Sequence, residues 1–232
     1  MKLRFATYNI HKGVGTDRRR DPERIMAVLR ETHADIVALQ ECDRRLGARA
    51  AVLPRALIDD SPWRVAPVAR RAQSMGWHGN AILVRRDLDI DECHALELPT
   101  LEPRGAVCAV IGSGRRQIRV VGTHLDLSGL RRRDQVRSLL AFSAEHGDIP
   151  TVIMGDFNQW GQSTGAMRAF GDDWHHILPG PSYPSRAPLA RLDRIVHCGR
   201  FRPGRAQVHH SALAAVASDH LPVWADLDLP KS

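Results

Sequence analysis

The feature of this sequence that most constrains the fold is a short apolar run that ends in two polar side chains. Residues 151–154 follow Pro150 and are mostly apolar and β-branched, which is typical of a buried strand. Gly155 then lets the backbone bend or approach a ligand closely. Asp156 and Asn158 project to the same side if the chain stays extended. The stretch predicts either a polar site at the tip of a strand or an Asp/Asn turn that merely ends it.

The same pattern recurs along the chain. Three more apolar runs lead to a polar side chain, namely residues 3–9 to Asn9, 34–39 to Glu41 and 117–122 to His124. Two others begin beside polar groups, one at Asp193 and one at Asp219-His220. Because strands of one sheet, or of two facing sheets, bring such ends to one edge, we expect acids, amides and imidazoles to gather around a single cleft.

Composition limits the class of protein. The chain has 232 residues, 43% of them hydrophobic, with no linker or repeat, so we expect one domain over residues 1–232. No apolar run reaches the roughly 18 residues of a membrane span, and the N-terminus has no apolar signal segment. The four cysteines are far apart, which favours reduced thiols and excludes a zinc motif. We therefore expect a soluble, cytoplasmic monomer.

The net charge of +7 indicates an anionic substrate without identifying it. Only three of the 33 basic residues are lysines, so the excess of arginine is also explained by genome base composition. The basic runs are short and scattered, and none is long enough to be a nucleic-acid tail. One of them, residues 131–133, is expected to be the solvated start of a helix that ends near residue 145.

The polar residue types suit the hydrolysis of a phosphoester. A carboxylate such as Glu41 binds a hard cation like Mg²⁺ through oxygen, and the cation polarises the phosphoryl group. An Asp can orient or deprotonate water, while His and Asn donate to the charge that grows on the phosphate. Simpler alternatives are a salt bridge from Glu41 to an arginine, and one from Asp193 to Arg191 or Arg194.

Seven segments, in this order, resemble the endonuclease/exonuclease/phosphatase superfamily, which includes deoxyribonucleases and abasic-site endonucleases. Each segment is weak evidence alone, but together they span nearly the whole chain and are specific. The likeness is to small bacterial members. It implies an α/β fold, a four-layer αββα sandwich of two mixed sheets with helices outside. The segments are Thr7-Tyr8-Asn9-Ile10-His11, Leu39-Gln40-Glu41, Gly79-Asn80-Ala81-Ile82-Leu83, Thr123-His124-Leu125, Gly155-Asp156-Phe157-Asn158, Arg191-Leu192-Asp193-Arg194-Ile195 and Ser218-Asp219-His220.

The resemblance also implies a metal site and a group that acts on water. Glu41 would be the principal ligand of Mg²⁺, or alternatively Mn²⁺, with Asn9 and Asp219 beside it. Asp156 would orient or deprotonate the attacking water, and Asn158 would hold a phosphate oxygen.

Further positions match residues of the superfamily that contact the phosphate. His220 would contact the scissile phosphate and would be held by Asp193. His124 would bind or protonate near the leaving group, as in the deoxyribonuclease branch. Arg104 and Asn80 would bind the phosphate.

The implied activity is Mg²⁺-dependent hydrolysis of a phosphodiester by in-line attack of a water activated by the metal and Asp156. A DNA endonuclease fits the basic charge and His124, although no DNA-inserting element is evident. A phospholipid or another small phosphodiester is the alternative substrate, and it fits the compact length. A non-catalytic binder of nucleic acid or lipid is the second alternative, but the intact set of site residues argues against it.

The aromatic residues are expected to fill the core rather than to form a substrate platform. This expectation covers Trp63, Trp77, Trp160 and Trp174, although Trp77 and Trp160 flank the site motifs. Most other histidines are expected at the surface or in packing positions, with His11 and His78 nearest the cleft.

Overall fold

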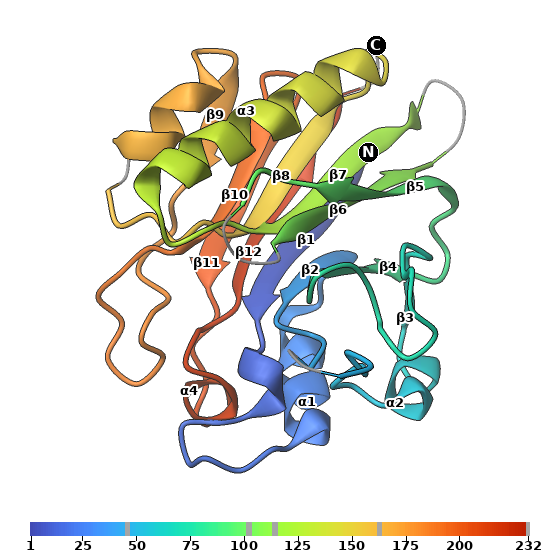
Figure 1. Cartoon of the computed structure of the whole chain (residues 1–232), viewed down its shortest axis with the longest axis vertical. Coiled ribbons are helices and arrows are strands. Elements are labelled where there is room, and N and C mark those ends of the chain that lie inside the picture. The colour runs from blue at the N-terminus through green and yellow to red at the C-terminus, as the bar shows by residue number, and fades with distance from the viewer. Residues whose placement is uncertain (45–46, 101–103, 113–115, 162–163, 231–232) are drawn as a thin grey trace.

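Two six-stranded mixed sheets pack face to face in the computed structural model of the chain (Figure 1), which describes residues 1–44, 47–100, 104–112, 116–161 and 164–230. Along the first sheet the strands are β11 (Arg202–Val208), β12 (Val223–Asp228), β1 (Lys2–Asn9), β2 (Ile36–Gln40), β4 (Ala81–Arg85) and β3 (Trp63–Val65). Along the second they are β5 (Ile90–Glu97), β6 (Gly105–Ile111), β7 (Ile118–His124), β8 (Thr151–Asp156), β10 (Asp193–Cys198) and β9 (Trp174–Ile177).

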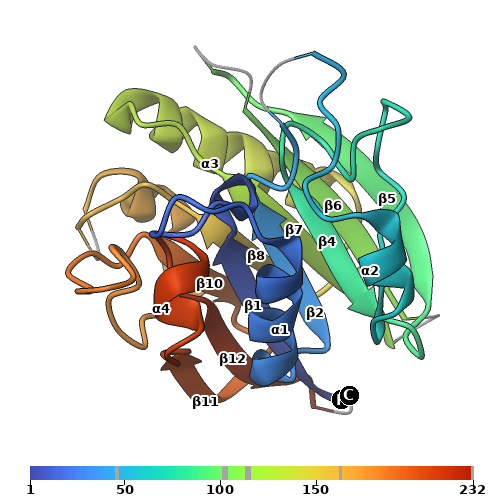
Figure 2. The same ribbon diagram turned by 90° about the horizontal axis from the view of Figure 1, so that it is seen from below.

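Helices cover the outer faces of both sheets (Figures 1 and 2). They are α1 (Pro22–Thr32), α2 (Arg55–Asp59), α3 (Gly129–Glu145) and α4 (Ala214–Ala217), with 3₁₀ turns η1 (His11–Gly13) and η3 (Gly165–Phe170). As its sequence predicts, α1 begins at an Asp–Pro pair, where the Asp21 carboxylate accepts from the amide of Arg24. None of the helices in the described ranges is long and apolar enough to cross a membrane.

Three apolar layers hold the sandwich together. Alternate residues of β1 face opposite ways: Phe5 packs between the sheets, while Ala6 and Tyr8 pack under α1. The third layer lies between α3 and the second sheet and includes Leu139 and Ile153. The expected four-layer αββα architecture is therefore confirmed.

A parallel pair of strands lies within each sheet and brings the strand tips together. In the first sheet Asn9 pairs with Gln40, and in the second His124 pairs with Asp156. Strand β10 runs antiparallel to β8, so that its first residue, Asp193, also pairs with Asp156. The ends of β1, β2, β7 and β8 and the start of β10 are thus fixed at one edge by backbone pairing.

The close pairing of β7 and β8 depends on a glycine. A Cβ added at Gly155 would lie 1.8 Å from the backbone oxygen of Thr123, which cannot withdraw without breaking the strand pair. We expect Gly155→Ala to lower the free energy of unfolding by about 2 kcal/mol or more, measured by urea denaturation. Gly129→Ala is the control, because its Cβ would meet only the Arg132 guanidinium at 3.6 Å. Equal stability of the two variants would contradict this account.

Candidate active site

Every residue that the sequence singles out lies at the edge where the two parallel strand pairs end. The last residues of three strands are Asn9, His124 and Asp156, and Glu41 and Asn158 lie just after a strand. Asp193 begins a strand. The remaining four lie just before a strand, namely Asn80, Arg104, Asp219 and His220. The gathering at one edge follows from the pairing of the strands, whereas the roles assigned to these residues remain predictions.

The Asp156 carboxylate is the centre of the site and is almost fully buried. Its Oδ2 accepts from Nδ2 of Asn9 at 3.0 Å, and its Oδ1 accepts from the backbone amide of Asn158 at 2.9 Å. The Nε2 atoms of His124 and His220 lie 3.4 and 3.7 Å from Oδ2. Burial alone would raise the pKa of Asp156, but the two imidazoles and these hydrogen bonds hold it below its usual value. The carboxylate is therefore ionised at neutral pH.

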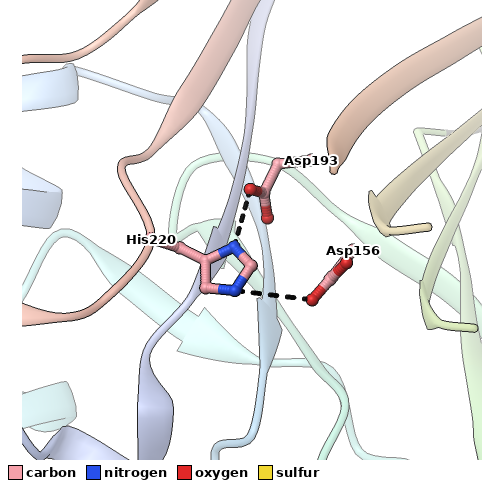
Figure 3. A group of neighbouring side chains, drawn as sticks. All are labelled: Asp156, Asp193 and His220. Atoms are coloured by element: carbon pink, nitrogen blue, oxygen red, sulfur yellow. Dashed lines mark hydrogen bonds and ion pairs between the residues drawn. The ribbon is translucent and has the colours of Figure 1, made fainter. Parts of the chain in front are cut away.

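His220 lies between two carboxylates (Figure 3). Its Nδ1 is 2.8 Å from Oδ2 of Asp193, which also accepts from the Ser182 hydroxyl at 2.5 Å, while its Nε2 faces Asp156. Burial would lower the pKa of this imidazole, but Asp193 and Asp156 outweigh burial and raise it to about 10. His220 is therefore a cation with both ring nitrogens protonated.

His124, the other imidazole beside Asp156, is neutral. Burial lowers its pKa to about 4, helped by the positive charge of Arg104 and opposed by Asp156. A neutral and a cationic imidazole thus flank one buried carboxylate, and this separation of pKa values is typical of sites that move protons.

Glu41 is held at the end of β2 in a left-handed backbone conformation, with φ of 55°. Gly79 packs against it, and the neighbouring Cys42 amide donates to the Gly79 carbonyl at 2.9 Å. Lys12 donates to the Glu41 carboxylate. Although burial opposes the shift, His124 and Lys12 lower the pKa of Glu41, so it is ionised. The alternative of a salt bridge to Glu41 is realised through a lysine rather than an arginine.

The donor atoms at this edge fit a divalent cation. Asp156, Asp193 and His220 place one ligand atom each within 4.8 Å of one another, a group that could hold a metal ion. Both ring nitrogens of His220 already face carboxylates, Nδ1 towards Asp193 and Nε2 towards Asp156. Oxygen donors remain, including Asp193 Oδ1, which is buried and has no hydrogen-bond partner among the described residues. Oxygen ligands are those that Mg²⁺ prefers.

The amides predicted to bind phosphate are engaged within the protein. Nδ2 of Asn158 donates to the Leu125 carbonyl at 2.9 Å, and Nδ2 of Asn80 donates to the Gly105 carbonyl at 3.0 Å. Asn80 thereby ties the start of β4 to the start of β6, beside Arg104.

Sequence reasoning missed three groups that hold these residues in place. Lys12 pairs with Glu41, Ser182 donates to Asp193, and the Ser218 hydroxyl donates to the Asn9 carbonyl at 2.7 Å. Lys12 directly follows one recognised motif and Ser218 is the first residue of another, which was the available signal. Ser182 lies in a proline-rich loop that carries no periodic pattern.

An αββα sandwich with carboxylates, amides, one neutral imidazole and one cationic imidazole at its paired strand tips defines a phosphoester-hydrolase class of protein. The sequence profile of the Endonuclease/Exonuclease/phosphatase family matches residues 6–220, and the chain belongs to this family. No curated protein matches the chain in sequence.

Solved structures share the fold over nearly the whole chain. An endonuclease/exonuclease/phosphatase family protein from Bacteroides thetaiotaomicron has a TM-score of 0.76 and 20% identity, and the match covers 100% of this chain and 99% of the other. A mannosyl-6-phosphatase of B. thetaiotaomicron VPI-5482 has 0.74 and 20%, with 97% and 99% covered. TDP2 of D. rerio, complexed with single-strand DNA product, has 0.73 and 15%, with 98% and 99% covered.

Proposed function

We propose that the protein is a Mg²⁺-dependent hydrolase of phosphodiesters that works by in-line attack of water. The observation that carries the proposal is the buried, ionised Asp156 between neutral His124 and cationic His220. Asp156 orients the water and takes up its proton, while His220 donates to the phosphate oxygens as their negative charge grows.

The charge state of His124 refines its predicted role. A neutral imidazole with a pKa near 4 is a poor proton donor at neutral pH, so His124 binds near the leaving group rather than protonating it. Glu41, with Asn9 and Asp219, would hold Mg²⁺. The bound cation would supply positive charge that stabilises the phosphoryl oxygens.

The substrate class is proposed separately from the reaction. Two proteins of the same fold are a mannosyl-6-phosphatase and TDP2 complexed with single-strand DNA product, so the fold does not choose between small and polymeric substrates. A net charge of +7 supports a nuclease. A phospholipid is the second candidate, and exposed apolar side chains beside the site favour it.

The proposal is tested by measuring hydrolysis of bis-p-nitrophenyl phosphate, supercoiled DNA and phospholipid with Mg²⁺, with Mn²⁺ and with EDTA. We expect hydrolysis of the small diester with either cation and at least an about 100-fold loss in EDTA, because the metal contributes several kcal/mol of charge stabilisation. Nicking of DNA would make the protein a nuclease. No turnover of any substrate, with metal bound, would instead support the non-catalytic binder.

A further inference from the structure

Four large apolar side chains are exposed around the candidate active site, and we call them the apolar rim: Leu127, Leu130, Trp160 and Leu189, with 67%, 73%, 67% and 78% of their surface exposed. Among the described residues, Met1 is the only other large hydrophobic residue that is exposed. The expectation that Trp160 lies in the core is therefore wrong. Two residues beyond the end of β8, Asn158 has a φ of 50°, and the chain then carries Trp160 outward.

The apolar rim comes from three segments that flank site residues. Leu127 and Leu130 follow His124, at the start of α3; Trp160 follows Asn158; and Leu189 precedes Asp193. Figures 1 and 2 both show the start of α3 and the loop before β10 along the same side of the molecule. Four of the five exposed large hydrophobic residues in the described part of the chain therefore belong to segments on this side, and such a grouping favours an interaction surface.

Two arginines tie these three segments to one another. The Arg132 guanidinium donates to the Leu127 carbonyl at 2.5 Å and to Oε1 of Gln159 at 3.3 Å. The buried Arg194 donates to the Gln159 carbonyl at 2.6 Å and to the Arg191 carbonyl at 3.2 Å. The apolar rim is therefore held in place rather than carried on independent loops.

The apolar rim also reaches the catalytic centre. The Leu189 amide donates to the Tyr183 carbonyl at 2.8 Å, and the Tyr183 ring lies against His220 with ring centroids 4.8 Å apart. If another surface covered the apolar rim, the outermost groups of that surface would therefore lie close to His220 and Asp156.

The charge around the apolar rim is positive. Arg131, Arg133 and Arg186 flank it with at least part of their side chains exposed, while the one acid within the first turns of α3, Asp134, is paired with Arg137 at 3.5 Å. Apolar side chains bordered by arginine match the boundary between the acyl chains and the anionic headgroups of a bilayer.

We propose that the apolar rim docks onto the surface of a phospholipid bilayer and brings lipid headgroup phosphodiesters to the site, an inference that rests on the proposed hydrolase. Three of its four residues are leucines, which offer no flat face for stacking bases. Against a nucleic-acid backbone the leucine side chains would face charged phosphates, whereas against a bilayer they would face hydrocarbon. Single-stranded nucleic acid is accordingly the weaker occupant, and the experiment includes it.

The test is co-sedimentation of the whole protein with vesicles of phosphatidylcholine and phosphatidylglycerol. We compare the wild-type protein with L127S/L130S/W160S/L189S and with the conservative set L127M/L130M/W160F/L189M. The serine set should lower the vesicle partition coefficient by about tenfold or more, whereas the conservative set should retain binding. Thermal unfolding of each variant verifies that it is folded.

A second pair of variants separates local from overall charge. R131S/R133S should weaken binding to the anionic vesicles more than R202S/R205S, which removes two exposed arginines of β11. Equal losses from the two pairs would overturn a specific surface at α3.

Three outcomes overturn the inference: a wild-type protein that does not sediment with vesicles, a serine set that sediments equally well, or a serine set that loses only binding to single-stranded DNA. Failure of the proposed function is a different result, namely no metal-dependent hydrolysis of bis-p-nitrophenyl phosphate by the wild-type protein. Soluble turnover without vesicle binding would therefore reject the docking surface and keep the hydrolase.

Discussion

Asp156→Asn should lower kcat by about 10³-fold, the largest single loss we expect, with bis-p-nitrophenyl phosphate and saturating Mg²⁺ as the assay. An amide cannot take up the proton of the attacking water, and the substitution removes one of the two carboxylates that hold His220 as a cation. It also places an NH₂ group among donors, since Asn9 Nδ2 and the Asn158 amide both donate to the present carboxylate. The loss should fall on kcat more than on KM, because proton transfer occurs only in the transition state.

Asp148→Asn is the matched control for this variant. Asp148 precedes the opposite end of β8, its side chain is 94% exposed, and its partner is the surface residue Arg200. Exposed ion pairs contribute about 1 kcal/mol or less, so kcat and thermal stability should both stay near wild type. If Asp156→Asn is folded and retains kcat within tenfold, Asp156 is not the group that activates water.

The sequence was sufficient to predict the interior of each sheet. All eight strands that lie between two neighbours were predicted, because such strands are buried on both faces and appear as continuous apolar runs. The runs are residues 3–9, 34–39, 81–84, 106–111, 117–122, 151–154, 192–196 and 223–227. The tips of these strands are also where the predicted site residues lie. Interior pairing and the site were therefore predictable together, since one apolar run specifies both the strand and the position where it ends.

The edges of the sheets were not predicted, and the reason is physical. The four missed strands are β3, β5, β9 and β11, and each is the edge of its sheet. In β11 six of the seven residues are exposed, and the strand contains Pro203 and Gly204, so no apolar period marks it. Edge strands are commonly polar or interrupted in this way, which blocks pairing with other chains. Their position depends on the neighbouring strand rather than on their own residues.

Charge states within the site depended equally on three-dimensional neighbours. Glu41, His124 and His220 were identifiable as functional side chains, but nothing local in the sequence distinguishes a neutral His124 from a cationic His220. That difference arises because Asp193 and Asp156 both contact His220, whereas His124 is buried beside Arg104. The pairing of Lys12 with Glu41 likewise requires the turn η1, where His11 and Lys12 adopt positive φ.

Asp193→Asn should have the second largest effect, a fall of about 10² to 10³-fold in kcat. This is less than the roughly 10⁴-fold loss that the same change causes in serine proteases, where the imidazole itself is the base. Asp193 is a positioning residue that acts through His220, whose Nδ1 lies 2.8 Å from its carboxylate. With an amide there, the ring loses a charged acceptor and its orientation, and cationic His220 is no longer stabilised from that side.

The pH profile separates this positioning role from simple destabilisation. Asp193 and Asp156 raise the pKa of His220 to about 10, so the wild-type protein keeps the active cation up to alkaline pH and loses it as pH rises through that value. Removing the charge of Asp193 lowers the pKa of His220, so the alkaline limb of the kcat profile should move to lower pH. Asp87→Asn, at an exposed carboxylate paired with Arg85, should leave the limb in place. If kcat falls but the alkaline limb stays in place, His220 still has its wild-type pKa in the Asp193→Asn protein. Asp193 would then support only the fold.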